Sequence, residues 1–318
     1  MIRLSTGGED LERAVALLRE GRLVGVPTET VYGLAGDASD RDAVRRIFAA
    51  KGRPPDHPLI VHLPDTASMA DWAAEVPAAA RRLADAFWPG PLTLVLRRGE
   101  RVPGVVTGGQ STVALRVPAH PVTRALLERF GGGLAAPSAN RFGRVSPTTA
   151  EHVESEFAGD ERVAAVIDGG SCEVGVESTI VDCTVEPPRL LRPGMIGMAA
   201  LEAALGSEVA VATAGQGPRA PGRLASHYAP RTPVAIVESA ALESGDPECA
   251  VLALEGSPDP GGFAAWKSLP AESAGYARGL YAALRELDSL GAERLLVQRP
   301  PDAPEWAAVH DRLERASS

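Results

Sequence analysis

Apolar residues in this chain occur in short runs of strand length, and these runs alternate with segments of helical periodicity. Residues 59–63 and 92–96 are the clearest strand-sized runs, whereas Leu11, Val15 and Leu18 recur at the spacing of a buried helix face. Strands that alternate with helices predict an α/β fold. Several short strands also follow one another directly, which favours a mixed sheet over a purely parallel one.

The 318 residues are enough for about two domains at a typical ~100–200 residues each. Residues 213–231 have no apolar periodicity and contain five Gly or Pro residues in their first ten positions, which is typical of a linker. Short strands and two helices, at about 273–288 and 304–315, are predicted again beyond it. We therefore predict a first domain over 1–212, a linker over 213–231 and a small α/β domain over 232–318.

Charge and composition exclude several classes of protein. The net charge of −9 and an aromatic content of 4% argue against a protein that coats DNA or RNA. Residues 233–318 carry 7 Lys and Arg against 14 Asp and Glu, so the acidic excess is concentrated at the C-terminal end. The three cysteines lack metal-ligand spacing, and we expect no protein-held metal.

No apolar stretch approaches the ~18 residues of a membrane span. The first 20 residues carry four acidic side chains and no apolar signal segment. We therefore expect a cytoplasmic protein without membrane association.

Cations and hydroxyl groups recur at the ends of predicted elements. Lys51 and Arg53 flank Gly52 at the end of a helix, where they could bind phosphate or simply suit the helix dipole. Ser138 and Asn140 lie on a turn after a short strand and could bind phosphate or ribose, although such residues are also common in plain turns.

Two further side chains lie inside apolar strands. Arg116 requires an anionic partner there, either a protein carboxylate or a ligand. His62 is most simply a core histidine. Motifs of nucleophilic catalysis, Walker A and Gly-rich dinucleotide loops are absent from the sequence. These residues together predict a pocket of cations and hydroxyls for an anionic small molecule.

Five segments, taken in order, resemble the YrdC-like domain of the L-threonylcarbamoyladenylate synthase family. They are Pro27-Thr-Glu-Thr-Val-Tyr-Gly-Leu34, Lys51-Gly-Arg53-Pro with Pro58-Leu-Ile-Val-His62, Ser138-Ala-Asn140, Glu177-Ser-Thr-Ile-Val-Asp182 and Leu191-Arg-Pro-Gly194. The linker segments Pro221-Gly222 and His227-Tyr-Ala-Pro230, and the tail Asp311-Arg-Leu-Glu-Arg-Ala316, resemble the long, two-domain form.

The resemblance implies an enzyme that joins L-threonine, bicarbonate or CO2, and ATP into threonylcarbamoyl-AMP and releases pyrophosphate. It implies a twisted mixed sheet with a concave cavity and a small Rossmann-like C-terminal domain. The product would pass to a partner tRNA threonylcarbamoyl transferase complex for N6-threonylcarbamoyladenosine at tRNA position 37.

The resemblance also implies the ligand-binding residues. Those for threonine would be Thr30, His62, Arg116, the backbone at Ala136, and Ser178. Those for ATP would be Lys51, Arg53, His57, Thr112, Ser138, Asn140, Ser146, Arg192 and Tyr228, with Lys51 and Arg53 as the catalytic cations. Mg²⁺ would be held mainly by the ATP phosphates, and Tyr228 would close over the nucleotide as part of a lid. Lys51 and Arg53 are expected to face solvent in the cavity. His57 replaces an asparagine more common in the family.

Three alternatives remain at this stage. An RNA-binding module of the same fold would bind tRNA without turning over ATP, which the acidic balance opposes. A carbamoyl-transfer enzyme shares the YrdC-like domain but carries zinc-finger cysteine pairs that this sequence lacks. A nucleotide sensor without activity would not need the full set of cations.

Overall fold

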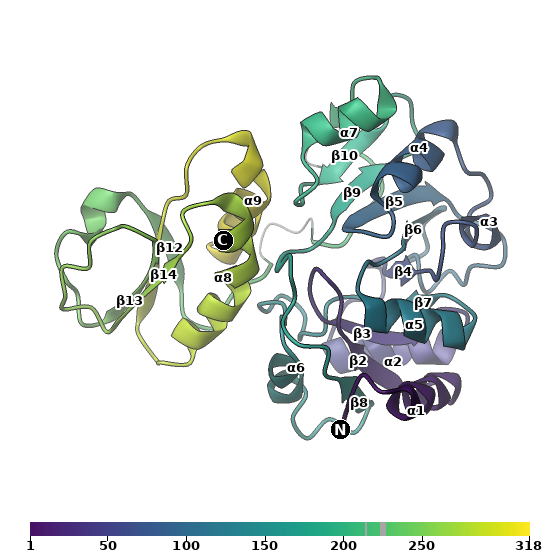
Figure 1. The fold of residues 1–318 in the computed structure, drawn as a ribbon, viewed down its shortest axis with the longest axis horizontal. Helices are drawn as coiled ribbons and strands as arrows, with labels where there is room; N and C mark the ends of the chain where they lie inside the picture. The colour runs from purple at the N-terminus through teal and green to yellow at the C-terminus, as the bar shows by residue number, and fades with distance from the viewer. Residues whose placement is uncertain (214, 223–226) are drawn as a thin grey trace.

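The computed structural model describes residues 1–213, 215–222 and 227–318, which form two sheets in two successive parts of the chain (Figure 1). The first sheet has the strand order β1-β8-β2-β3-β7-β4-β6-β5-β9-β10-β11. Its strands are β1 (Ile2–Leu4), β2 (Leu23–Val26), β3 (Gly33–Asp37), β4 (Ile60–His62), β5 (Leu92–Arg97), β6 (Thr112–Arg116), β7 (Leu134–Ala135), β8 (Val163–Ile167), β9 (Thr179–Asp182), β10 (Arg189–Arg192) and β11 (Ala210–Val211). The sheet is mixed, as predicted, because β4 pairs with β6 in parallel whereas β5 pairs with β6 antiparallel.

Helices cover the first sheet on both faces (Figure 1). They are α1 (Gly8–Arg19), α2 (Arg41–Lys51), α3 (Met69–Trp72), α4 (Ala78–Phe87), α5 (Pro121–Phe130), α6 (Ala150–Glu156) and α7 (Met198–Leu205). Helix α2 begins where the sequence predicts, because the Asp40 side chain accepts a hydrogen bond from the Asp42 amide. It ends at Gly52, whose φ of 63° is the left-handed conformation that glycine tolerates.

Side chains of successive strand residues enter different layers, because a strand alternates its two faces. In β4, Val61 packs into the core beneath α2, α3 and α4, whereas Ile60 joins a separate apolar cluster with Ala114 of β6. His62 and Arg116 occupy the same alternate positions as Ile60 and Ala114, so they emerge on that second face. The face of β4 and β6 that carries His62 and Arg116 is therefore the face on which a cavity can form.

The second sheet forms the core of the C-terminal part. It has the order β12-β15-β13-β14 and is entirely parallel. Its elements are β12 (Val234–Val237), η1 (Ser239–Leu242), β13 (Cys249–Leu254), β14 (Ala265–Leu269), α8 (Ser273–Asp288), β15 (Arg294–Gln298), η2 (Pro304–Trp306) and α9 (Ala307–Ala316). Helices α8 and α9 pack on one face of it and lie toward the N-terminal part (Figure 1).

Several elements were missed by the sequence prediction. Strand β3 contains Gly33 and Gly36, which interrupt the apolar pattern, and a Cβ at Gly36 would make tight contacts with the side chains of Leu23 and Ile47. Helix α6 follows a polar stretch and depends on Thr149, whose side chain accepts from the His152 amide. Strands β1, β11 and β14 and helix α3 are short or carry polar residues, so periodicity did not reveal them.

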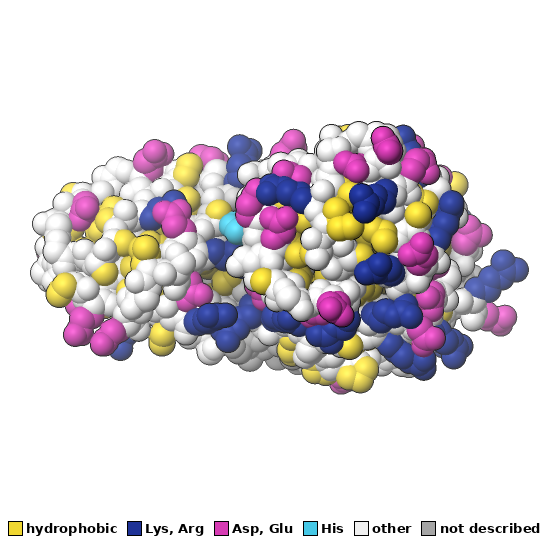
Figure 2. All heavy atoms as spheres, turned by 90° about the horizontal axis from the view of Figure 1, so that it is seen from below, with side chains coloured by type: hydrophobic (Ala, Val, Ile, Leu, Met, Phe, Trp, Pro, Cys, Tyr) yellow, Lys and Arg dark blue, Asp and Glu magenta, His cyan; other side chains and the backbone are white. Residues whose placement is uncertain are grey.

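The predicted linker, residues 213–231, contains no helix or strand in the positions that the structure describes. The separation into domains at 212 and 232 stays a prediction. Among the described helices none is long and apolar enough to cross a membrane. In Figure 2 the N-terminal part shows basic and acidic side chains interspersed, whereas acidic ones outnumber basic ones on the C-terminal part.

Candidate active site

One small enclosed cavity collects side chains from segments far apart in the sequence. Its volume is about 50 Å³. The residues that line it are Thr28, Thr30, Val31, Gly33, Arg53, Ile60, His62, Arg116, Ala136, Pro137, Ser138, Glu177, Ser178, Arg192, Pro221, Gly222, His227 and Tyr228. The cavity therefore brings together most of the residues that the sequence singled out, on strand ends of the first sheet and on the linker.

Arg116 lies in the wall of this cavity beside His62, because the two residues are register partners on the parallel strands β4 and β6. The Arg116 guanidinium forms an ion pair with Glu29, at 2.7 Å between Nη2 and Oε1, and donates to Thr30 Oγ1 at 2.9 Å. Of the two partners considered for this arginine, a protein carboxylate is therefore present. Burial alone would raise the pKa of Glu29, but the Arg116 charge lowers it, so the pair is ionised.

Lys51 is buried behind the cavity and not solvent-facing as predicted. Its Nζ donates to the backbone carbonyls of Ser138 and Asn140 at the end of β7. Only 2% of the residue is exposed, and burial together with Arg53 holds the pKa of its amine well below the usual range. The prediction that Lys51 faces solvent in the cavity was wrong, because its amine is turned toward the two backbone carbonyls and away from water.

Arg53 and Arg192 are the two other cations of the cavity wall. Arg53 is also buried and not solvent-facing, with 7% exposed, and its Nη2 donates to the Pro58 carbonyl at 2.9 Å. Its Nε has no hydrogen-bond partner among the described residues. Arg192 donates to the backbone carbonyls of Ser178 and Pro221, at 2.8 and 2.9 Å. Burial lowers the pKa of Arg53 to about 10, so it keeps its charge at neutral pH.

His62 is enclosed, and neither ring nitrogen has a hydrogen-bond partner within the described part of the chain. Burial and the neighbouring Arg116 charge lower its pKa to about 3, so the imidazole is neutral at physiological pH. A neutral imidazole with two unpartnered nitrogens in a polar cavity can both accept and donate a hydrogen bond.

Four linker residues complete the lining of the cavity, namely Pro221, Gly222, His227 and Tyr228. Tyr228 is 1% exposed and has a φ of 63°, a strained conformation for a residue with a side chain. Its ring lies edge-on to His227, with centroids 4.1 Å apart. Gly222 lies directly beneath it, since a Cβ on Gly222 would approach the Tyr228 hydroxyl to 2.1 Å. Residues 223–226 lie outside the described part of the chain.

Five of the proposed ATP ligands do not line the small cavity. Lys51 and Asn140 lie behind the Ser138 turn, and the Ser146 hydroxyl donates to Glu177 Oε1 at 2.6 Å. Thr112 occupies the far end of β6 from Arg116. His57 packs edge-on against Phe142, with centroids 5.3 Å apart, and lines a second cavity.

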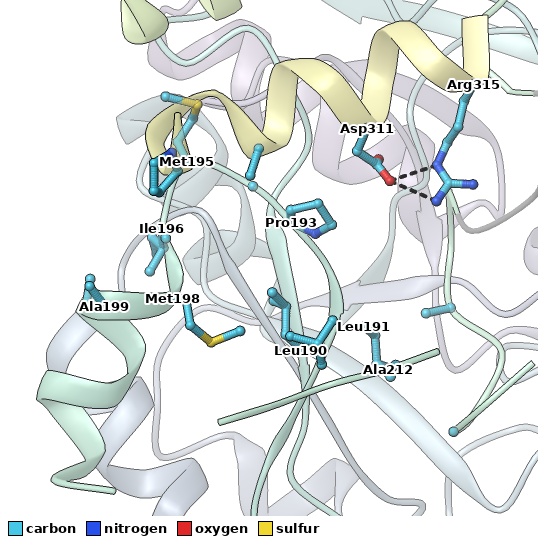
Figure 3. A pocket seen from close by; sticks show the side chains of 18 of the residues that line it. Leu190, Leu191, Pro193, Met195, Ile196, Met198, Ala199, Ala212, Asp311 and Arg315 are labelled. Carbon is cyan, nitrogen blue, oxygen red and sulfur yellow. Dashed lines mark hydrogen bonds and ion pairs between the residues drawn. The ribbon is translucent and has the colours of Figure 1, made fainter. Parts of the chain in front are cut away.

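That second cavity is larger, about 1220 Å³, and lies between the two parts of the chain (Figure 3). It is bounded by the β10–α7 segment, by linker residues near 215–220 and by helix α9. Met195, Ile196 and Met198 give it an apolar wall, and on α9 the Arg315 guanidinium pairs with Asp311 at 2.8 Å (Figure 3).

A mixed α/β sheet with a cavity lined by arginines and hydroxyls is typical of a protein that binds anionic small molecules. Two family models together match nearly the whole chain: one described as "Telomere recombination", of the Sua5, YciO and YrdC proteins, over residues 16–194, and "Threonylcarbamoyl-AMP synthase, C-terminal domain" over residues 196–318.

Curated relatives agree with these models. The chain is 42% identical to the threonylcarbamoyl-AMP synthase of Pyrococcus abyssi, covering 96% of this chain and 93% of the relative. It is 39% identical to that of Bacillus subtilis, covering 99% and 94%. It also matches the crystal structure of P. abyssi Sua5 complexed with L-threonine, with a TM-score of 0.90, 38% identity and coverage of 99% and 97%. The chain therefore belongs to the threonylcarbamoyl-AMP synthase family of enzymes.

Proposed function

We propose that the enclosed cavity is where this chain carries out the reaction of its family. That reaction joins L-threonine, bicarbonate or CO2, and ATP into threonylcarbamoyl-AMP with release of pyrophosphate, for the threonylcarbamoyladenosine modification of tRNA position 37. The single observation that carries the assignment is the convergence of Arg53, Arg116 and Arg192 on one enclosed space.

The chemistry requires neutralisation of charge more than a nucleophile from the protein. The threonine amine attacks carbon dioxide and loses a proton, and a carbamate forms. A carbamate oxygen then attacks the α-phosphorus of ATP, and the bond to pyrophosphate breaks. Both reactants are anionic, so fixed cations that hold an in-line geometry stabilise the transition state.

We assign threonine to the end of the cavity formed by Thr30, His62, Arg116, Ala136 and Ser178. Glu29 orients the Arg116 guanidinium, whose Nη1 donates to Thr30 Oγ1. Arg116 would receive the carboxylate of threonine, and the neutral His62 ring would bond its polar groups. The Ser178 hydroxyl, which lies 2.8 Å from Thr93 Oγ1, adds a second polar contact.

We assign the ATP phosphates to Arg53, Arg192 and the Ser138–Asn140 turn, which Lys51 holds through two carbonyls. Ile60, Ala114 and Leu191 belong to one apolar cluster, in which Ala114 stands between Arg116 and Thr112 on β6, and an apolar surface of this kind suits a purine. His57, Thr112 and Ser146 would then contact the ATP molecule from the edges of its binding site. With a volume of about 50 Å³ this closed form of the cavity is too small for ATP, so the linker with Tyr228 must move outward to admit it and would close over the bound nucleotide in a wider arrangement.

Mg²⁺ would enter with ATP and be held mainly by its phosphates. The described residues include no group of three or more His, Cys, Asp or Glu side chains suited to a metal ion. Among the described residues that line the cavity, Glu177 carries the one carboxylate, and both of its oxygens accept hydrogen bonds from protein donors. Bound Mg²⁺ would neutralise phosphate charge, and the product would pass to a tRNA-modifying transferase.

Binding measurements on two variants test these assignments. Arg116→Gln should raise the Kd of L-threonine and leave that of ATP unchanged, whereas Arg53→Gln, which removes a cation bonded only to the Pro58 carbonyl among the described residues, should do the reverse. Equal effects of both variants on both ligands would contradict the division of the cavity into two subsites.

A further inference from the structure

Arg312, in the C-terminal part of the chain, bonds to a residue that lines the cavity. Arg312 of α9 is 1% exposed, and its Nε lies 2.8 Å from Oε2 of the cavity residue Glu177. Its Nη2 donates to the backbone carbonyls of Glu177 and Pro193, at 3.3 and 3.1 Å. A single side chain thus bonds two segments that also carry Ser178 and Arg192.

Tyr281 of α8 makes a second contact with the same carboxylate. Its hydroxyl donates to Glu177 Oε2 at 2.9 Å, while Ser146 donates to Oε1 at 2.6 Å. Burial would raise the pKa of Glu177, but the charges of Arg312 and Arg192 and the bonds from Ser146 and Arg312 lower it to about 2. A carboxylate so fully bonded cannot take up a proton at neutral pH, so its role is to hold its neighbours.

The same two side chains also support the linker. The Arg312 guanidinium carbon lies 5.2 Å from the centroid of the Tyr228 ring, and the Tyr281 ring stacks on Tyr228 with centroids 5.7 Å apart and planes at 29°. Tyr228 holds a strained positive φ of 63°, a conformation that persists only where surrounding contacts hold it. Two of those contacts come from the C-terminal part.

A third side chain of the C-terminal part, that of Arg285, bonds to the N-terminal part near Ser146. Arg285 of α8 donates to the backbone carbonyls of Val145 and Ser146 and forms an ion pair with Glu156 at 3.0 Å. Helices α8 and α9 therefore bond the segments of Ser146, Glu177 and Tyr228 together. Ser146 and Tyr228 are among the proposed ATP ligands, and Glu177 directly precedes Ser178, which we assign to threonine.

We propose that Arg312 and Tyr281 are positioning residues, through which the C-terminal domain holds Glu177 and, with it, the segments of Ser146 and Arg192 that we assign to ATP, and so sets how tightly ATP is retained. The inference rests on the proposed function of the cavity. It gives the C-terminal domain a part in catalysis, although neither side chain lines the cavity itself.

Tyr281→Phe and Arg312→Lys test the proposal in the full-length protein, each with a matched control. Tyr276→Phe makes the same change on the same helix, at a hydroxyl without a hydrogen-bond partner in the described residues. Arg278→Ala removes a contact across the same interface, to the Glu173 carbonyl at 2.8 Å, away from the cavity. The measurements are the KM for ATP, the kcat of threonine-dependent pyrophosphate release, and ATP hydrolysis without threonine.

We expect Tyr281→Phe to raise the KM for ATP about tenfold, which corresponds to loss of one hydrogen bond to a charged group, and Arg312→Lys to raise it more. Both should raise ATP hydrolysis without threonine relative to synthesis. The controls should match the wild type. Wild-type kinetics in Tyr281→Phe, or equal changes in Tyr276→Phe and Arg278→Ala, would overturn the proposal. If Arg312→Lys does not fold, Tyr281→Phe decides. A wild-type protein without threonine-dependent release would overturn the proposed function first.

Discussion

The guanidinium of Arg116, in the wall of the cavity, lies 2.7 Å from Oε1 of Glu29, and both side chains are almost wholly buried. This ion pair explains how an arginine can stand inside an apolar strand, since each charge compensates the other away from water. The ion pair also fixes the guanidinium beside Thr30 and His62. In this position the guanidinium is oriented to bind the carboxylate of threonine, as we propose.

Glu29→Gln tests this pair. The substitution leaves a buried arginine without a counter-charge, so we expect the free energy of unfolding to fall by about 3–5 kcal/mol in urea titrations. Glu12→Gln is the control, because Glu12 pairs with Arg129 at 3.2 Å on the surface and should contribute under about 1 kcal/mol. A loss in Glu29→Gln no larger than in the control would show that the pair does not stabilise the fold.

Arg53→Ala tests the phosphate site. Loss of a fixed cation from an enclosed site should lower the kcat of threonine-dependent pyrophosphate release roughly 10²–10³-fold, while circular dichroism stays native. Arg53→Lys should recover part of the rate, because lysine keeps the charge but not the planar fork. Near-normal turnover in the alanine variant would show that Arg53 is not a catalytic residue.

Lys51→Met should combine two effects. The lysine bonds two carbonyls of the Ser138–Asn140 turn, so its loss should lower both pyrophosphate release and the thermal midpoint. Differential scanning calorimetry beside the rate assay separates this outcome from that of Arg53→Ala, which we expect to affect mainly the rate. A variant with normal stability and no activity would place the Lys51 amine on the substrate and not on the turn.

Gly222→Ala tests the closure by the linker. A Cβ at this position would approach the Tyr228 hydroxyl to 2.1 Å and would also strain a φ of +77°. Gly256→Ala is matched for backbone strain, with a φ of +90° and no heavy atom near a new Cβ. We expect only Gly222→Ala to weaken ATP binding. Equal ATP affinity in both variants would show that Tyr228 does not need its present place.

Acid stability should depend on Glu177. The folded pKa of its carboxyl, about 2, lies below its ordinary value of 4.5, so its contribution to stability is present above pH 4.5 and lost as the pH falls toward 2. Glu177→Gln should therefore flatten the decline of the unfolding free energy between pH 4.5 and 2. If the unfolding free energy of that variant falls between pH 4.5 and 2 as steeply as that of the wild type, the ionised, bonded state of this carboxylate would be contradicted.

The sequence predicts the strands and helices of this fold where periodicity is strong, as in α2 and α8, and misses β3, whose glycines serve close packing. Motif resemblance named most of the residues that line the cavity. Periodicity cannot show which charged side chains become buried by tertiary packing, so the solvent-facing expectation for Lys51 and Arg53 was wrong. Arg312 was missed although it stands on the buried face of α9 beside Val309 and Leu313, where a charge signals a buried partner.

Pyrophosphate release from ATP tests the central claim most directly, measured with bicarbonate and either L-threonine, L-serine, glycine or no amino acid. We predict release that requires both L-threonine and bicarbonate, since the carbamate must form before the α-phosphorus is attacked. Release that is independent of the amino acid, or none from a folded protein, would contradict the assignment of the cavity to threonylcarbamoyl-AMP synthesis.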